Sequence, residues 1–281
     1  MNKETLSLTA LAMMMLTACG GGSDDSNTSA ATPAPVVTTP APAPTPTPTP
    51  TPPVTTTPAP AITASAEGVY EGMYGSALTH LTLVTDDTFM YTIVGTTTGG
   101  VFAINRFLVG RGSSTNGAFT APEVHAYGSG ATAATGTFTG TYAPGASLNG
   151  TLQLDGASTT MTGSALANST YNYNTPATLA NVAGAWTLTG VDGARVMLTV
   201  GADGNFTGTN GTCSVTGSFV PRASGKNVFN FKVISGPAPC ARPADVSTGV
   251  AVEFSIGSTR QLVAAATGVT LVNGTGWIGS R

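Results

Sequence analysis

Histidine and carboxylate side chains are the residues of this sequence that could carry acid-base or metal chemistry, and they are few. The only two histidines are His80 and His125. One interpretation is a His-carboxylate pair or a weak metal site. The carboxylates within reach in the sequence are Glu71, Asp86, Asp87 and Glu123. The other interpretation is structural, because His80 precedes a predicted strand and Asp86-Asp87 falls in a predicted hairpin turn, where aspartate bonds to nearby backbone.

Known catalytic motifs are absent from the sequence. It contains no Gly-x-Ser-x-Gly elbow, no His-Glu-x-x-His and no phosphate-binding glycine loop placed between a strand and a helix. This favours the structural interpretation of both histidines. We therefore expect a protein that is not an enzyme and that requires no cofactor or metal ion.

The cysteines indicate a disulfide in the C-terminal half. Cys213 and Cys240 form an even pair, which in an exported domain is typical of a disulfide. The loop that they close has about 28 residues, which corresponds to roughly 3.5 kcal/mol of stabilisation in the chain-entropy treatment. A zinc site is the alternative, but the second half of the chain has no histidine to complete a tetrahedral set.

Charge is sparse and unevenly distributed. Only 8% of residues are charged and the net charge is -3, which argues against nucleic-acid binding, since that requires a clustered basic surface. Residues 68–166 carry five acidic and two basic residues, for -3, whereas residues 181–281 carry four acidic and seven basic residues, for +3. The two halves could therefore dock on one another, or the second could bind an acidic partner such as glycan or lipopolysaccharide. The residues to test for an anionic partner are Arg222, Lys226, Lys232 and Arg242.

The N-terminus has the features of an export signal. Lys3 supplies a positive residue, and Leu6 to Ala18 is an uncharged stretch of thirteen residues, too short for a membrane-spanning helix. Leu16-Thr17-Ala18-Cys19 resembles the lipobox of bacterial lipoproteins. That resemblance implies cleavage after residue 18, followed by diacylation of the Cys19 sulfur and acylation of its amine. The mature chain would then be anchored to a membrane without spanning it.

The residues after Cys19 suggest a location. In lipoproteins of this type an aspartate directly after the cysteine implies retention in the inner membrane, and here that position is Gly20. The resemblance therefore implies the outer membrane of a Gram-negative cell, with the surface and periplasmic faces both open. The run Gly20-Gly21-Gly22 also resembles the tether of surface lipoproteins of the transferrin-binding and factor-H-binding type.

A proline-rich segment follows. From Thr32 to Pro60 the sequence is almost wholly proline, alanine, threonine and valine. Alternating prolines fix φ and remove amide donors, so we expect neither helix nor sheet but an extended polyproline stalk, disordered as a tertiary structure. Its reach is on the order of 90 Å at about 3.1 Å per residue. Residues 19–63 are thus predicted to be a linker.

Beyond residue 64 the pattern is typical of β structure. In the second half, Trp186, Leu188, Val196 and Leu198 recur at period two, and Asp192-Gly193 and Asp203-Gly204 separate the runs. Asp-Gly flanked by alternating hydrophobic residues predicts antiparallel hairpins. About eight strands fit between Ala185 and Ile278.

The first half resembles a second copy of this plan. Gly68, Tyr70, Leu81, Leu83 and Phe89 match Gly184, Trp186, Val196, Leu198 and Phe206, with Gly-to-Phe separations of 21 and 22 residues. We therefore predict a tandem duplication within an all-β fold. It would consist of two small antiparallel barrels of about eight strands each, or compact sandwiches, because closure removes exposed strand edges. The predicted boundaries are 1–18 signal, 64–166 first domain, 167–181 connector and 182–281 second domain.

Two functions fit these features. The first is an outer-membrane lipoprotein that presents two β domains to bind a host protein, a glycan or a small hydrophobic ligand. The second is a structural or assembly lipoprotein of the envelope that holds another envelope protein and has no small-molecule ligand. An empty apolar cavity within a barrel would favour ligand capture, whereas filled barrels would move the search to loops and outer faces.

Overall fold

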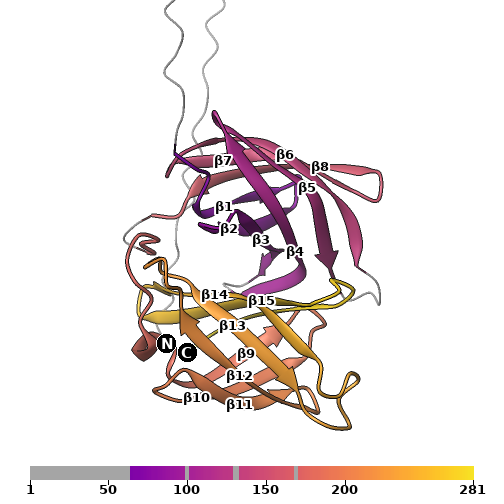
Figure 1. Cartoon of the computed structure of the whole chain (residues 1–281), viewed down its shortest axis with the longest axis vertical. Helices are drawn as coiled ribbons and strands as arrows, with labels where there is room; N and C mark the ends of the chain where they lie inside the picture. The colour runs from indigo at the N-terminus through magenta and orange to yellow at the C-terminus, as the bar shows by residue number, and fades with distance from the viewer. Residues whose placement is uncertain (1–63, 99–100, 129–132, 168–169) are drawn as a thin grey trace, which may run out of the picture. The chain divides into compact units, whose positions relative to one another are not determined.

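The protein contains two closed antiparallel β-barrels in tandem, as the sequence predicts (Figure 1). The computed structural model describes residues 64–98, 101–128, 133–167 and 170–281. The predicted signal, Cys19 and the proline-rich stalk lie outside the described residues. Across the part that is described, no helix is long and apolar enough to cross a membrane.

Each barrel is an up-and-down meander of eight strands, in which the last strand pairs with the first. The first barrel comprises β1 (Gly68–Tyr74), β2 (Leu78–Val84), β3 (Phe89–Thr98), β4 (Val101–Thr115), β5 (Ala118–Tyr127), β6 (Ala134–Ala143), β7 (Ser147–Leu154) and β8 (Ala157–Ala165). The second comprises β9 (Gly184–Gly190), β10 (Arg195–Val200), β11 (Asn205–Asn210), β12 (Cys213–Pro221), β13 (Phe229–Ser235), β14 (Val246–Ile256), β15 (Thr259–Gly268) and β16 (Gly274–Ser280). One helical turn that the sequence did not predict, α1 (Leu179–Val182), precedes β9.

The predicted Asp-Gly hairpins are present. Gly193 and Gly204 adopt φ of 78° and 82°, a left-handed conformation that glycine reaches without a Cβ clash. Each aspartate accepts a hydrogen bond from the amide two residues later, at 3.0 Å for Asp192 and 3.1 Å for Asp203. These turns set the β9–β10 and β10–β11 pairings.

The first three strands of the two barrels share one register. In each barrel a glycine that opens the first strand pairs with a valine that ends the second, and that valine pairs with the second residue of the third strand. These residues are Gly68, Val84 and Met90 in the first barrel and Gly184, Val200 and Phe206 in the second. The match of Phe89 to Phe206 was therefore wrong by one position. Met90 is buried in the interior, whereas Phe89 packs outside the barrel beside Tyr91. The shared register supports a duplication.

The same register shows that the prediction of which β2 side chains point into the barrel was wrong. Leu81 and Leu83 were matched to Val196 and Leu198, which face the interior of the second barrel. In the first barrel the corresponding interior positions belong to His80 and Thr82, both buried. Leu81 and Leu83 instead point outward into a cluster shared with the second barrel.

An aromatic side chain closes one end of each barrel in the same way. The Tyr70 hydroxyl donates to the Ala66 carbonyl at 2.9 Å, and the Trp186 indole N–H donates to the Val182 carbonyl at 2.7 Å. In both barrels the acceptor lies four residues earlier, in the segment that enters the first strand. That segment covers the barrel end, and in the second barrel it is α1.

Large side chains fill both barrels. Tyr70, Met90, Phe119, Phe138 and Leu152 occupy the first interior. The second holds an aromatic cluster in which Phe231 stacks on Phe206 and Phe219, with ring centroids 5.8 and 5.1 Å apart, and the edge of Trp277 meets Phe231 at 5.3 Å. Neither barrel is therefore hollow through its centre, and any binding site lies at a barrel end or on an outer face.

The two barrels belong to one compact unit and share a buried apolar contact. Outward residues of β1, β2 and β3 cluster with outward residues of β14 and β15, and Figure 1 shows β14 and β15 as the strands of the second barrel nearest the first. On β16, Gly274 allows close approach: a Cβ there would lie 2.9 Å from atoms of Phe107 and Tyr127. The Tyr127 hydroxyl also donates to the Leu271 carbonyl at 2.7 Å. The barrels thus bury an apolar face between them.

Candidate functional site

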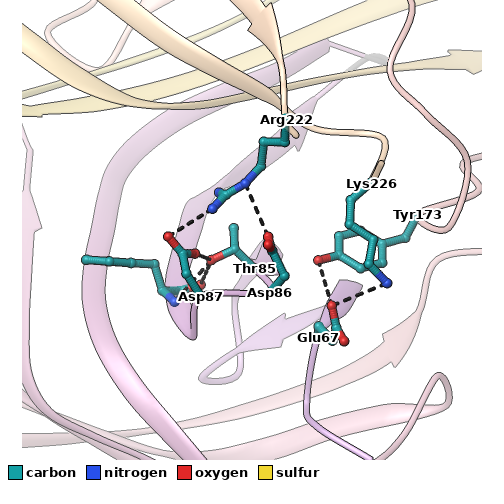
Figure 2. Close-up of polar contacts among 8 residues, drawn as sticks. Glu67, Thr85, Asp86, Asp87, Tyr173, Arg222 and Lys226 are labelled. Carbon is teal, nitrogen blue, oxygen red and sulfur yellow. Dashed lines mark hydrogen bonds and ion pairs between the residues drawn. The ribbon is translucent and has the colours of Figure 1, made fainter. Parts of the chain in front are cut away.

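Opposite charges join the barrels at the β2–β3 hairpin. Arg222 follows β12. Its Nε lies 3.2 Å from an Asp86 carboxylate oxygen, and its Nη2 lies 2.9 Å from an Asp87 carboxylate oxygen (Figure 2). Burial tends to raise the pKa of Asp87, but hydrogen bonds from Thr85 and Arg222 hold it below its usual range. The Arg222 side chain is mostly buried, so the ion pair lies within the contact between the barrels. Docking of the two halves through opposite charges was one of the two possibilities that the sequence left open.

A second ion pair lies beside it. Lys226 places its Nζ 3.4 Å from a Glu67 oxygen, and the Tyr173 hydroxyl donates to the same oxygen at 3.3 Å (Figure 2). The Lys226 ammonium also lies over the Tyr173 ring, 5.0 Å from its centroid. Burial, followed by the nearby Glu67 and Asp86 carboxylates, raises the pKa of Tyr173 above its ordinary value. Lys226 is thus engaged between the barrels in the same way as Arg222.

The other two predicted cations lie elsewhere. Arg242 pairs with Asp245 in its own loop at 3.2 Å, with most of its side chain exposed. Lys232 is exposed on β13. The structure therefore does not bring Arg222, Lys226, Lys232 and Arg242 into one cationic surface.

His80 is a buried member of a hydrogen-bond chain. Its Nε2 lies 3.0 Å from the Thr162 carbonyl, which can only accept, so Nε2 carries the proton and Nδ1 accepts from the Thr82 hydroxyl at 2.9 Å. Thr82 in turn lies 2.9 Å from Thr92. Burial lowers the pKa of His80, with the Thr162 bond opposing that change. The imidazole is held neutral inside the first barrel, where it satisfies buried hydroxyl groups.

His125 lies on the outer face of the first barrel. On β5 it contacts Glu123 at 2.9 Å, and the Glu123 side chain is exposed. The two histidines therefore do not converge, since His80 faces inward on β2. Among the described residues, no group of three or more histidine, cysteine, aspartate or glutamate side chains could hold a metal ion.

The predicted disulfide between Cys213 and Cys240 is formed. It ties the start of β12 to the loop between β13 and β14, which contains Arg242 and Asp245. This loop is therefore held at one open end of the second barrel.

Replacing both Cys213 and Cys240 by alanine is expected to lower the free energy of unfolding by about 3.5 kcal/mol, because the unfolded chain regains the entropy of a loop of about 28 residues. Urea unfolding of the variant and of the wild type, each with and without reductant, measures this difference. Reductant should destabilise the wild type and leave the variant unchanged. A loss below about 1 kcal/mol would show that the bond strains the folded state or that the unfolded chain keeps structure in this segment without it.

An apolar groove lies between the two barrels. Its volume is about 600 Å³. Its walls are outward apolar side chains of both barrels, including Met73, Leu81, Phe102, Phe254, Ile256 and Val263. Met73 and Ile256 are 40% and 54% exposed, so the groove opens to solvent. Polar side chains are fewer, and the one carboxylate in the lining is Glu71. Sequence reasoning missed this site because it combines the outer faces of strands from both barrels.

A smaller hollow of about 250 Å³ lies at the open end of the second barrel, where Tyr127, Gly128 and Ala133 of the first barrel also line it. Its lining is more polar and includes Asn210, Arg242, Asp245, Asn273 and Trp277. Cys213 also lies in its wall. No lining residue is shared with the groove.

Comparisons with known proteins give no functional assignment. No family model matches the chain, and no curated protein matches it. Among solved structures, a crystal structure of a protein of unknown function from the DUF3598 family of Nostoc punctiforme is similar over 76% of this chain and 96% of that one, at 12% identity. The TM-score is 0.25, so the site is interpreted from its own geometry alone.

Proposed function

We propose that this protein is a lipoprotein, anchored to the outer membrane through Cys19, which binds a small hydrophobic molecule in the groove between its two barrels. The groove is the observation that carries this proposal. Its volume of about 600 Å³ lies within the range of about 300 to 1,000 Å³ typical of small-molecule sites. Of the partner classes expected from the sequence, a small hydrophobic ligand fits this lining best.

The barrels act as the rigid walls of the site. Apolar clustering and the Arg222 and Lys226 ion pairs hold the two barrels together beside the groove. Exposed apolar side chains such as Ile256 are costly to leave in water unless something covers them. A bound hydrophobic molecule would cover them and gain about 25 cal/mol for each Å² of apolar area removed from water.

The lining also restricts the head group of the ligand. Glu71 is the one charged side chain in the groove wall, and a carboxylate there repels a second negative charge. We therefore expect a ligand without negative charge that turns any polar group toward Glu71 and Gln261, which are among the polar lining residues. A binding role is favoured over catalysis, because the two histidines lie on opposite faces of the first barrel.

The neutral fluorescent probe N-phenyl-1-naphthylamine tests the site directly. Its emission should rise and saturate with the wild-type protein. A double variant, Met73→Asp with Ile256→Asp, should bind it at least about tenfold more weakly, because two charges then stand in an apolar lining. Both residues are partly exposed, so the change should cost little stability.

Val269→Asp is the matched control, since Val269 is a 95% exposed aliphatic residue outside the groove. It should leave probe binding unchanged. Equal loss in the control and the double variant, or no loss in the double variant, would rule out the groove as the binding site.

A further inference from the structure

The two tryptophans at the opposite ends of the second barrel differ in the hydrogen bonding of their indole N–H groups. At the end covered by α1, the Trp186 indole N–H donates to the Val182 carbonyl at 2.7 Å, and the Arg281 guanidinium lies 4.3 Å from the ring centroid. Arg281 also donates to the Asn181 carbonyl at 2.9 Å. This end is therefore closed, and its buried indole is fully bonded.

At the other end, Trp277 forms part of the floor of the hollow of about 250 Å³. Its side chain is 1% exposed and packs edge-on against Phe206 and Phe231. Val215 and Val233 line the hollow beside Trp277, and Tyr127, Val191 and Val272 are further apolar residues of its wall. The disulfide-bound loop borders the hollow through Arg242 and Asp245.

Two residues that line this hollow each have a buried polar atom with no hydrogen-bond partner among the described residues. These atoms are the indole Nε1 of Trp277, a donor, and the side-chain carbonyl oxygen of Asn210, an acceptor. Leaving such a group unpaired costs about 1–3 kcal/mol, and buried polar groups in folded proteins are nearly always paired. Trp186 shows that this fold can satisfy an indole from its own backbone. Among the described residues, the open end thus has one donor and one acceptor without a partner, which a ligand could supply.

The chemistry of the ligand follows from these two groups and from the rim. A hydroxyl group can accept from Trp277 and donate to Asn210, and a sugar carries several of them. Asp192 and Asp245 line the hollow against one cation, Arg242, which is already paired with Asp245. An anion would therefore be repelled. We propose that the open end of the second barrel binds a small, neutral, polyhydroxylated molecule of the size of one sugar ring, held by Trp277 Nε1–H and Asn210.

The two indole N–H signals of the ¹⁵N-labelled protein provide the test. Trp277→Phe and Trp186→Phe assign them, since the chain has two tryptophans. Titration uses glucose, galactose, ribose and N-acetylglucosamine, with inorganic phosphate and acetate as anionic probes. At least one sugar should move the Trp277 signal saturably and leave the Trp186 signal in place. Asn210→Ala should weaken that binding by about tenfold or more, the value of one lost hydrogen bond to a buried group.

Three results would overturn the proposal. These are no saturable shift with any sugar up to high millimolar concentrations, saturation by phosphate or acetate instead of a sugar, and equal movement of both indole signals. The Trp186 signal reports whether each variant is folded. If Trp277→Phe fails to fold, Asn210→Ala alone decides, because Asn210 is at the end of β11 and only half-buried. The outcome is independent of the groove, since the two sites share no lining residue.

Discussion

Cys19→Ala is expected to move the protein entirely from the membrane fraction to the soluble fraction. In the proposed lipoprotein, the Cys19 sulfur carries two acyl chains through a diacylglycerol group, and its amine carries a third. Each buried CH₂ contributes about 0.8 kcal/mol, and one chain alone gives only marginal membrane binding. Without the thiol the diacylglycerol group cannot be attached. The effect should therefore be all or none at the level of fractionation.

Fractionation of cells that express the tagged wild type and variant measures this effect, and mass spectrometry of the mature N-terminus identifies the acyl groups. The control is the double variant Cys213→Ala with Cys240→Ala, which also loses cysteines but keeps residue 19. It should remain with the membranes. A Cys19→Ala protein that still sediments with membranes would contradict the lipobox assignment and leave the barrels to be located by other means.

The strand pattern of this protein could be predicted from its sequence because turns and closure are local or nearly local. Asp192-Gly193 and Asp203-Gly204 carry the left-handed glycine that a tight hairpin needs, and both are turns in the structure. The disulfide was predictable from the cysteine count. The eight strands in each half follow from such turn residues together with the period-two alternation of apolar residues.

The facing of the strands could not be predicted in the same way. Alternation gives two faces and assumes that the apolar one points inward. On β2 the apolar residues Leu81 and Leu83 point toward the second barrel, and the interior positions hold His80 and Thr82. A sheet buried on both faces carries no sequence signal that separates its inside from its outside. The groove was missed for the same reason, since its lining is made mostly of outward side chains.

Docking of the barrels explains another limit of the sequence. The opposite net charges of the two halves predicted either that the halves dock on one another or that the second half binds an acidic partner. Net charge alone could not distinguish these two possibilities. The choice depends on distance: Asp86 and Asp87 in the β2–β3 turn lie within 3.2 Å of Arg222, whereas Lys232 lies exposed on β13. Cations that are close in sequence are therefore separated in the fold.

Val252→Asp is expected to lower the free energy of unfolding by about 3 kcal/mol or more and to uncouple the two barrels. Val252 lies on the outer face of β14, is 4% exposed and belongs to the apolar cluster that contains Val69 and Leu83 of the first barrel. A carboxylate at that position loses its hydration and gains no cation, which is among the most costly changes in a folded protein. Separation of the two barrels would expose this carboxylate to water again, so the substitution favours separation.

Urea unfolding followed by two signals measures this effect. Both tryptophans, Trp186 and Trp277, lie in the second barrel, so their fluorescence reports that barrel alone, whereas circular dichroism reports both. In the wild type the two curves should coincide, because the shared apolar cluster couples the barrels. In Val252→Asp they should separate. Leu83→Asp, which places the charge on the first barrel's side of the same cluster, should separate them too.

Val220→Asp is the matched control, since Val220 points outward from β12 of the same barrel but is 51% exposed. It should change stability by less than about 0.5 kcal/mol and keep the two curves together. If Val252→Asp behaved like Val220→Asp, the cluster would not hold the barrels together and the groove between them would have no fixed walls. Because the proposed hydrophobic site requires both walls, separated curves should be accompanied by loss of N-phenyl-1-naphthylamine binding.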